Sequence, residues 1–191
     1  FAEIKEKQVL IRTHGVAPEI YDEAKRRGLQ IWDCTCPFVR KVQKIAHERS
    51  LNGDQVLILG NKEHPEVIGI LGWAGEQSIA FADISELDLE KLRGKKITLV
   101  SQTTENVAKF ERAAAVLSEV AGELAVYNTI CSATQERQND AKELAKKVEA
   151  MVVIGGKNSA NTQKLVSLCS EWTKTYHVES AQDLTPQIFR A

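Results

Sequence analysis

CPFVRKVQKIAHERSLNGDQVLILGNKEHPE, at residues 36–66, decides the fold, because its layout returns at residues 131–161 as CSATQERQNDAKELAKKVEAMVVIGGKNSAN. Each copy runs from a cysteine through a helical pattern, an apolar strand and a glycine turn to the start of a second helix. The copies align without a gap at a spacing of 95 residues, which places Ser159 on His64 and Asn161 on Glu66. A repeat of this kind indicates one supersecondary unit that is used several times.

Short apolar runs rich in valine, isoleucine and leucine alternate with amphipathic stretches along the chain. The runs lack strict alternation, which predicts strands buried on both faces, as in a parallel sheet covered by helices. We therefore expect an α/β fold with mostly parallel sheets. The expected strands lie at residues 8–13, 29–35, 55–60, 78–83, 96–104, 124–130, 150–156 and 174–180.

The repeat also predicts where each unit begins and ends. KEKQVLIRTHGV (5–16) matches RGKKITLVSQTT (93–104), and His14 and Thr103 both lie in the loops that end the two matching stretches. The expected units are 1–28, the C-terminal part of a first unit, 29–123, a complete second unit, and 124–191, an incomplete third unit. We interpret the chain as an internal fragment of a pseudo-threefold protein. The first cysteine of that protein is expected roughly 50 residues before Phe1.

Composition and charge exclude several classes of protein. In 191 residues, 25 basic side chains are balanced by 26 acidic ones, whereas a nucleic-acid-binding surface shows a basic excess. No apolar run approaches the roughly 18–20 residues of a membrane-spanning helix, and no signal peptide opens the chain. Four irregularly spaced cysteines favour a reducing, cytoplasmic setting over a disulfide framework. We expect neither nucleic acid nor a membrane as a partner.

Two cysteines hold equivalent places in the repeat. Cys36 and Cys131 each end a strand and open a helix, a position that favours a thiolate metal ligand. With the inferred third cysteine they would hold a [4Fe–4S] cluster that leaves one iron open. Two alternatives stay open: structural cysteines at strand ends, or a zinc site that uses Cys34 with Cys36. Cys34, on the opposite face of its strand, and Cys169, in a helix, are expected to pack inside the protein.

The loops that follow the strands carry polar side chains at helix starts. Pro65 fits the first helical position, which makes His64 the expected N-cap and Glu66 a first-turn carboxylate. Ser159 and Asn161 hold the same places in the second copy. Helix N-termini with unpaired amides and small polar side chains are natural phosphate sites, although such side chains also serve as plain caps.

A second set of loops, RTHGV at 12–16 and SQTT at 101–104, brings His14 and Thr103 to the same sheet edge. A glutamate next to a histidine at an edge that also carries a metal indicates proton transfer. Glu66 is therefore the candidate acid.

The motifs DCTCPFVRKV, GNKEHPEV, VSQTT, NTICSATQERQ and GGKNSANT, with RTHGV ahead of them, resemble those of the 4-hydroxy-3-methylbut-2-enyl diphosphate reductases, the LytB or IspH proteins. The resemblance covers the whole chain and implies a trefoil of three α/β units around a central iron–sulfur cluster. It implies the last step of the methylerythritol phosphate pathway, in which reductive loss of an allylic hydroxyl gives isopentenyl and dimethylallyl diphosphates. The implied electron donor is a protein such as ferredoxin or flavodoxin.

The resemblance also implies roles for particular residues. Cys36 and Cys131 are cluster ligands, and because the third lies outside this chain we expect this piece alone to be inactive. The implied substrate-binding residues are His14, His64, Thr103, Ser159 and Asn161. Glu66 is the implied proton donor, working with Thr103 near the substrate hydroxyl. Ala160 departs from the many relatives that carry serine there, and a further diphosphate-binding histidine and serine lie outside the chain.

A second class of function stays open on sequence alone. A non-catalytic α/β module that binds a phosphorylated ligand at its helix N-termini would need the same loops. Such a module would bind a diphosphate equally well with and without a cluster, which separates it from the reductase.

Overall fold

The computed structural model describes residues 6–185. The chain forms two compact units, a larger one of residues 1–103 and 108–129 and a smaller one of residues 104–107 and 130–191. The outer ends of the first and third expected repeat units, residues 1–5 and 186–191, lie outside the described residues. The two compact units do not test the expected repeat boundaries after residues 28 and 123, which stay a prediction.

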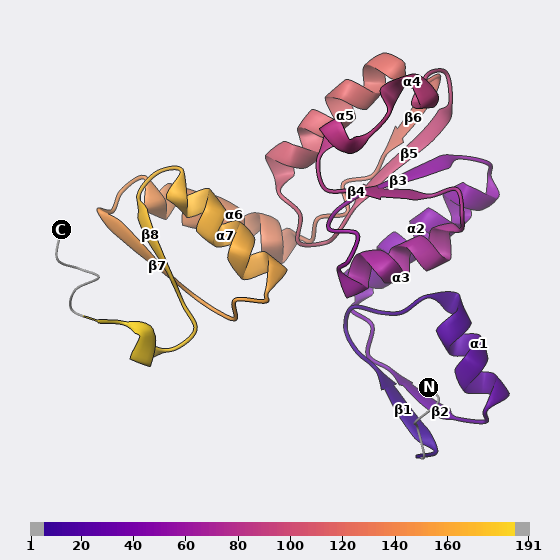
Figure 1. Ribbon diagram of the computed structural model, residues 1–191, viewed down its shortest axis with the longest axis horizontal. Coiled ribbons are helices and arrows are strands. Elements are labelled where there is room, and N and C mark those ends of the chain that lie inside the picture. Colours follow the sequence, from indigo (N-terminus) through magenta and orange to yellow (C-terminus); the bar gives the residue numbers. More distant parts are fainter. Residues whose placement is uncertain (1–5, 186–191) are drawn as a thin grey trace. The chain divides into compact units, whose positions relative to one another are not determined.

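A four-stranded parallel sheet forms the centre of the larger unit (Figure 1). Its strands stand in the order β4, β3, β5, β6, and each pairing between them is parallel. Their bounds are Gln55–Leu59 for β3, Ile79–Phe81 for β4, Lys96–Ser101 for β5 and Glu123–Val126 for β6. Except at their first residues, β3 and β5 are buried, as their unbroken apolar sequences predict.

Helices cover both faces of this sheet, with α2 and α3 on one face and α5 on the other (Figure 1). Their bounds are Pro37–Leu51 for α2, Pro65–Ala74 for α3, Leu89–Leu92 for α4 and Val107–Val120 for α5, with a 3-10 turn at Ile84–Glu86. The α2–α3 face is filled by a core of Val42, Ala46, Val56, Ile58, Val67, Ile70, Ala74 and Val100. This packing fixes the first turn of α3 at the carboxyl end of β3.

Two further sheets have two parallel strands each. β1 pairs with β2 in the larger unit, and β7 pairs with β8 in the smaller unit. The bounds are Gln8–Ile11 for β1, Pro18–Arg26 for α1, Gln30–Asp33 for β2, Ser132–Ala145 for α6, Ala150–Ile154 for β7, Ala160–Ser170 for α7 and Lys174–Val178 for β8, with a 3-10 turn at Ala181–Asp183. In the smaller unit α6, α7 and β7 meet at Ala145, Val153 and Cys169.

Each of the eight predicted strands is present, and the parallel pairing is confirmed. The expectation of burial on both faces is wrong for the two-stranded sheets. Leu10 in β1 is 66% exposed, Trp32 in β2 is 55% exposed and Ile154 in β7 is 69% exposed. The physical reason is that two strands with one or two helices cover only part of each other's side chains.

Each repeat cysteine follows the last strand, in chain order, of one sheet. β2 leads to Cys36 and pairs with β1, whereas β6 leads to Cys131 and pairs with β5. The helix that follows each cysteine then leads into the next sheet, from α2 to β3 and from α6 to β7. Each repeat cysteine thus lies where the chain passes from one sheet to the next.

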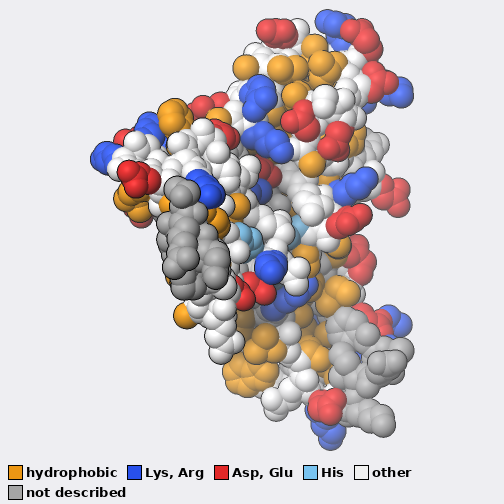
Figure 2. Space-filling view, turned by 60° about the vertical axis from the view of Figure 1, so that its left-hand side comes forward, with side chains coloured by type: hydrophobic (Ala, Val, Ile, Leu, Met, Phe, Trp, Pro, Cys, Tyr) orange, Lys and Arg blue, Asp and Glu red, His pale blue; other side chains and the backbone are white. Residues whose placement is uncertain are grey.

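The surface carries charges of both signs. On the face shown in Figure 2, basic and acidic side chains are interspersed, in keeping with the net charge of −1. Among the described helices, none has the length and apolar character needed to span a membrane.

Candidate active site

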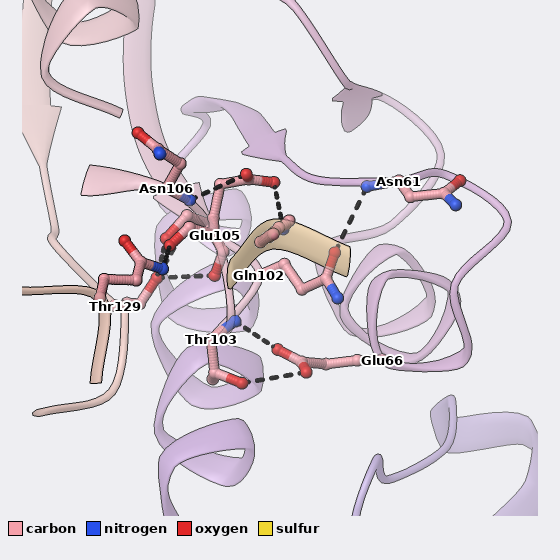
Figure 3. A network of polar contacts seen from close by, with 10 residues as sticks. Asn61, Glu66, Gln102, Thr103, Glu105, Asn106 and Thr129 are labelled. Atoms are coloured by element: carbon pink, nitrogen blue, oxygen red, sulfur yellow. Dashed lines mark hydrogen bonds and ion pairs between the residues drawn. The ribbon is translucent and has the colours of Figure 1, made fainter. Parts of the chain in front are cut away.

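Glu66 and Thr103 meet inside the larger unit (Figure 3). Glu66 lies in the first turn of α3 and Thr103 follows β5, so neighbouring parallel strands bring the two together. The Thr103 backbone N–H donates to Glu66 Oε1 at 2.6 Å, and the Thr103 hydroxyl donates to Oε2 at 3.0 Å. Both residues are buried. Since a hydroxyl can accept as well as donate, this pair can pass a proton to a third group.

His64 is the N-cap of α3, as predicted from Pro65 at the first helical position. Its backbone is extended, with φ −72° and ψ 134°, and its Nδ1 accepts a hydrogen bond of 3.2 Å from the Glu66 N–H. A ring nitrogen that accepts carries no proton, so the proton of the neutral imidazole lies on Nε2. The cap therefore places the proton of a neutral His64 ring on Nε2.

His14, in the loop after β1, contacts the His64 ring edge to face. The ring centroids are 5.2 Å apart and the ring planes are inclined by 80°. The Nδ1 of His14 is buried and has no hydrogen-bond partner among the described residues. Burial first, and the positive charge of Arg12 second, lower the pKa of His14, so its ring is neutral at pH 7. A buried ring nitrogen of this kind is suited to a ligand.

Gln102 is a site residue that the sequence did not single out. Its side chain is fully buried, and its Oε1 accepts a hydrogen bond of 3.4 Å from the Asn61 N–H (Figure 3). A Cβ at Gly60 would lie 2.8 Å from the Gln102 Cβ, so the turn after β3 requires a glycine there. Gln102 thus holds the turn that leads to His64 against the loop that carries Thr103, and Gly60 is the sequence feature that could have indicated this close approach.

The polar loop of the smaller unit has the same layout as the loop around His64. Ser159 is the N-cap of α7, and its hydroxyl accepts a hydrogen bond of 3.3 Å from the Thr162 N–H. Asn161 lies in the first turn, where its Oδ1 is buried with no partner in the described part of the chain. Because a carboxamide can turn either its oxygen or its NH2 to such a place, Asn161 is able to donate to an anion.

Cys36 and Cys131 are the N-caps of α2 and α6, as the repeat predicts. Both thiols are free and partly exposed, and the Cys131 Sγ lies 2.9 Å from the Thr134 hydroxyl oxygen. Within residues 6–185 no three His, Cys, Asp or Glu side chains gather as a metal-binding group. The described residues thus supply two partly exposed thiols at helix N-termini, one in each unit, and thiols are the side chains that iron–sulfur clusters require as ligands.

The other two cysteines differ from each other. Cys169 is fully buried in the core of the smaller unit, as expected, and burial raises the pKa of its thiol. The expectation that Cys34 packs inside the protein is wrong, because its side chain is exposed. Cys34 follows β2, whose sheet has two strands and covers little of this face.

Fold and site together define an α/β protein whose strand-end loops carry two imidazoles, a buried carboxylate–hydroxyl pair and thiols at helix N-termini. The family model described as LytB protein matches residues 1–191. The chain belongs to the LytB family.

Curated relatives carry one common name. The 4-hydroxy-3-methylbut-2-enyl diphosphate reductase of Clostridioides difficile (strain 630) is 42% identical over 179 residues, which cover 93% of this chain and 64% of that protein. The enzyme of the same name from Caldanaerobacter subterraneus subsp. tengcongensis is 42% identical over 188 residues, which cover 98% of this chain and 65% of that protein. The chain therefore spans just under two thirds of the length of these relatives.

Solved structures agree with this assignment. A structure of (E)-4-hydroxy-3-methyl-but-2-enyl diphosphate reductase, the terminal enzyme of the non-mevalonate pathway, matches 98% of this chain and 68% of its own with 37% identity and a TM-score of 0.66. The E-1-hydroxy-2-methyl-but-2-enyl-4-diphosphate reductase from Plasmodium falciparum matches 98% of this chain and 60% of its own with 26% identity and a TM-score of 0.89. These similarities confirm the predicted fold class, the α/β trefoil with mostly parallel sheets.

Proposed function

We propose that the full-length protein containing this chain reduces (E)-4-hydroxy-3-methylbut-2-enyl diphosphate to isopentenyl diphosphate and dimethylallyl diphosphate, the terminal step of the non-mevalonate pathway. Two electrons and two protons enter, and one water leaves. The observation that carries the proposal is the buried Glu66–Thr103 pair next to the His14–His64 pair. The family resemblance implies that these residues are the acid, its hydroxyl partner and diphosphate contacts.

Neutral donors would bind the diphosphate. His64 presents Nε2–H because its Nδ1 is engaged as the cap of α3, and the neutral ring of His14 lies against it. Ser159 and Asn161 would contribute from the first turn of α7, where backbone amides and the helix dipole attract an anion. Hydrogen bonds to a charged acceptor are strong even when the donor is neutral, so a near-zero net charge is compatible with a diphosphate ligand.

Glu66 would be the acid and Thr103 its relay. The protonated carboxyl would donate to the Thr103 hydroxyl oxygen, and that hydroxyl would turn its own proton toward the oxygen that leaves the substrate. The backbone bond from Thr103 to Glu66 Oε1 holds the carboxyl in place during this exchange. Since both side chains are buried, bulk water does not compete for the proton.

Cys36 and Cys131 would hold a [4Fe–4S] cluster with a third cysteine from outside this chain. When bound, such a cluster supplies electrons and a Lewis-acidic iron for the substrate oxygen. We infer a ferredoxin or flavodoxin as the electron donor, and a cytoplasmic location.

The proposal is tested with the full-length protein after anaerobic reconstitution with iron and sulfide. Given a chemical reductant and the substrate, it should release both products, identified by mass spectrometry. The competing function is a non-catalytic module that binds a phosphorylated ligand. Calorimetry with a diphosphate supports that module if affinity is the same with and without the cluster and no product forms.

Replacing His64 with asparagine should raise KM by about 10- to 100-fold, the loss expected for one hydrogen bond to a charged group. Asparagine is a good N-cap, so the acceptor for the Glu66 N–H is retained and α3 keeps its start. Steady-state kinetics measure the change, and Glu63→Asn, at the exposed residue directly before His64, serves as the matched control. An unchanged KM in His64→Asn would remove His64 from the diphosphate site.

A further inference from the structure

Glu105, two residues beyond Thr103 in the chain, is held at three points within the smaller unit. Its side chain is 4% exposed, and Oε2 lies 2.9 Å from the Lys164 Nζ. Its Oε1 accepts a hydrogen bond of 2.9 Å from the Asn106 N–H (Figure 3), and its carbonyl oxygen accepts one of 2.9 Å from the Gln138 Nε2. A glutamate this deeply buried and this fully paired fixes its own stretch of backbone.

The two helices that hold Glu105 are those expected to carry function. Gln138 lies on α6, seven residues after Cys131, which is the N-cap of that helix. Lys164 lies on α7, three residues after Asn161 and so on the same side of the helix. Glu105 is therefore anchored to the helix of an expected cluster ligand and to the helix of the expected diphosphate contacts.

The corresponding loop of the first repeat copy is held without charges. Val16 lies two residues after His14, as Glu105 lies two residues after Thr103, and the 95-residue spacing aligns Gly69 with Lys164. The Val16 carbonyl accepts a hydrogen bond of 3.0 Å from the Trp73 Nε1, and a Cβ at Gly69 would lie 3.5 Å from the Val16 carbonyl carbon. The first loop thus packs directly on its helix, whereas the second uses an ion pair. In both copies a loop after a strand is therefore held against a neighbouring helix. In the loop that follows Thr103, the Glu105–Lys164 ion pair makes this contact.

We propose that Lys164 and Glu105 are positioning residues, which fix the loop so that Thr103 meets Glu66 before the substrate arrives. The inference rests on the proposed function. Removing the Lys164 charge leaves the Glu105 carboxylate buried without its ion-pair partner. The loop around Glu105 must then shift to bring that carboxylate into contact with water. A displacement of about 1 Å at a reacting group can lower a rate by up to about 100-fold.

The test uses the full-length, cluster-loaded protein with Lys164→Met, which keeps the aliphatic stem and removes the charge. We expect kcat to fall by about tenfold or more while KM stays within about twofold, and Lys164→Arg to keep the wild-type kcat. In substrate-free protein, amide hydrogen exchange over residues 101–107 should become at least about tenfold faster, because the Thr103 N–H loses its fixed place opposite Glu66. Lys91→Met, which breaks the exposed pair with Asp88, is the matched control and should change neither quantity.

The outcomes separate this inference from the proposed function. A wild-type protein that turns over, with Lys164→Met showing the same kcat and the same exchange, overturns the positioning role and leaves the function intact. If Lys164→Arg shows the same fall in kcat as Lys164→Met, the positioning role is also overturned, because the fall would then not depend on the positive charge at residue 164. If the cluster-loaded wild type does not turn over, the proposed function fails, and the exchange rates of the two variants still decide whether the ion pair fixes the loop.

Discussion

Replacing Glu66 with glutamine should lower the proposed reductase kcat of the full-length protein by about 100- to 10,000-fold, the contribution typical of a positioned general acid. Glutamine has nearly the same shape, and its Oε1 can still accept the hydrogen bond from the Thr103 N–H. Its NH2 can face the Thr103 hydroxyl, which then acts as the acceptor. The site therefore keeps its geometry and loses only the transferable proton. KM, which reports diphosphate binding by other residues, should change by less than about threefold.

Glu63→Gln is the matched control. Glu63 is exposed in the turn before the same helix, and its replacement by glutamine is the same chemical change as Glu66→Gln. Visible absorbance and the thermal unfolding midpoint show whether cluster and fold are intact in both variants. Turnover at the wild-type rate in Glu66→Gln would exclude Glu66 as the acid. A loss of absorbance in that variant would mean that Glu66 supports the cluster site instead.

Cys131→Ser should abolish both the visible absorbance of the reconstituted full-length protein and its turnover. Serine is among the best N-cap residues, whereas the Cys131 side chain makes no capping hydrogen bond, so α6 is expected to keep its start or gain stability. The variant therefore removes the proposed cluster ligand without weakening the local fold. Iron content per protein and the absorbance spectrum measure the loss directly.

Cys34→Ser provides the control for this experiment and also separates iron–sulfur from zinc ligation. Cys34 is a free, exposed thiol two residues before Cys36, and the cluster assignment does not use it. We expect Cys34→Ser to keep the absorbance and the turnover. A colourless wild-type protein that binds zinc and loses it in Cys34→Ser would favour the zinc site over the cluster.

Features that depend on residues close together in the sequence were predicted correctly. Pro65 at the first helical position identified His64 as an N-cap, and the repeat register then identified Ser159 as its counterpart; both caps are present. The meeting of Glu66 with the loop of Thr103 was predictable because parallel strand ends share one edge of a sheet. Periodicity and capping chemistry therefore predicted these local placements, and the roles of the residues stay proposals.

Features that depend on tertiary packing were not predictable in this way. The Glu105–Lys164 pair joins residues far apart in the sequence, and no spacing rule links them. Gln102 is a polar residue in a loop, and its complete burial follows from the close approach at Gly60. The exposure of Cys34 follows from the small size of its sheet, which the apolar pattern of one strand does not encode.

Product analysis after anaerobic incubation of the cluster-loaded, full-length protein with the hydroxylated diphosphate and a chemical reductant tests the central claim most directly. We expect isopentenyl and dimethylallyl diphosphates both to appear, and water to carry the lost oxygen when the substrate hydroxyl is labelled with heavy oxygen. The Glu66→Gln protein should form neither product at a comparable rate. Recovery of unchanged substrate from wild-type protein that shows the full cluster absorbance would contradict the central claim.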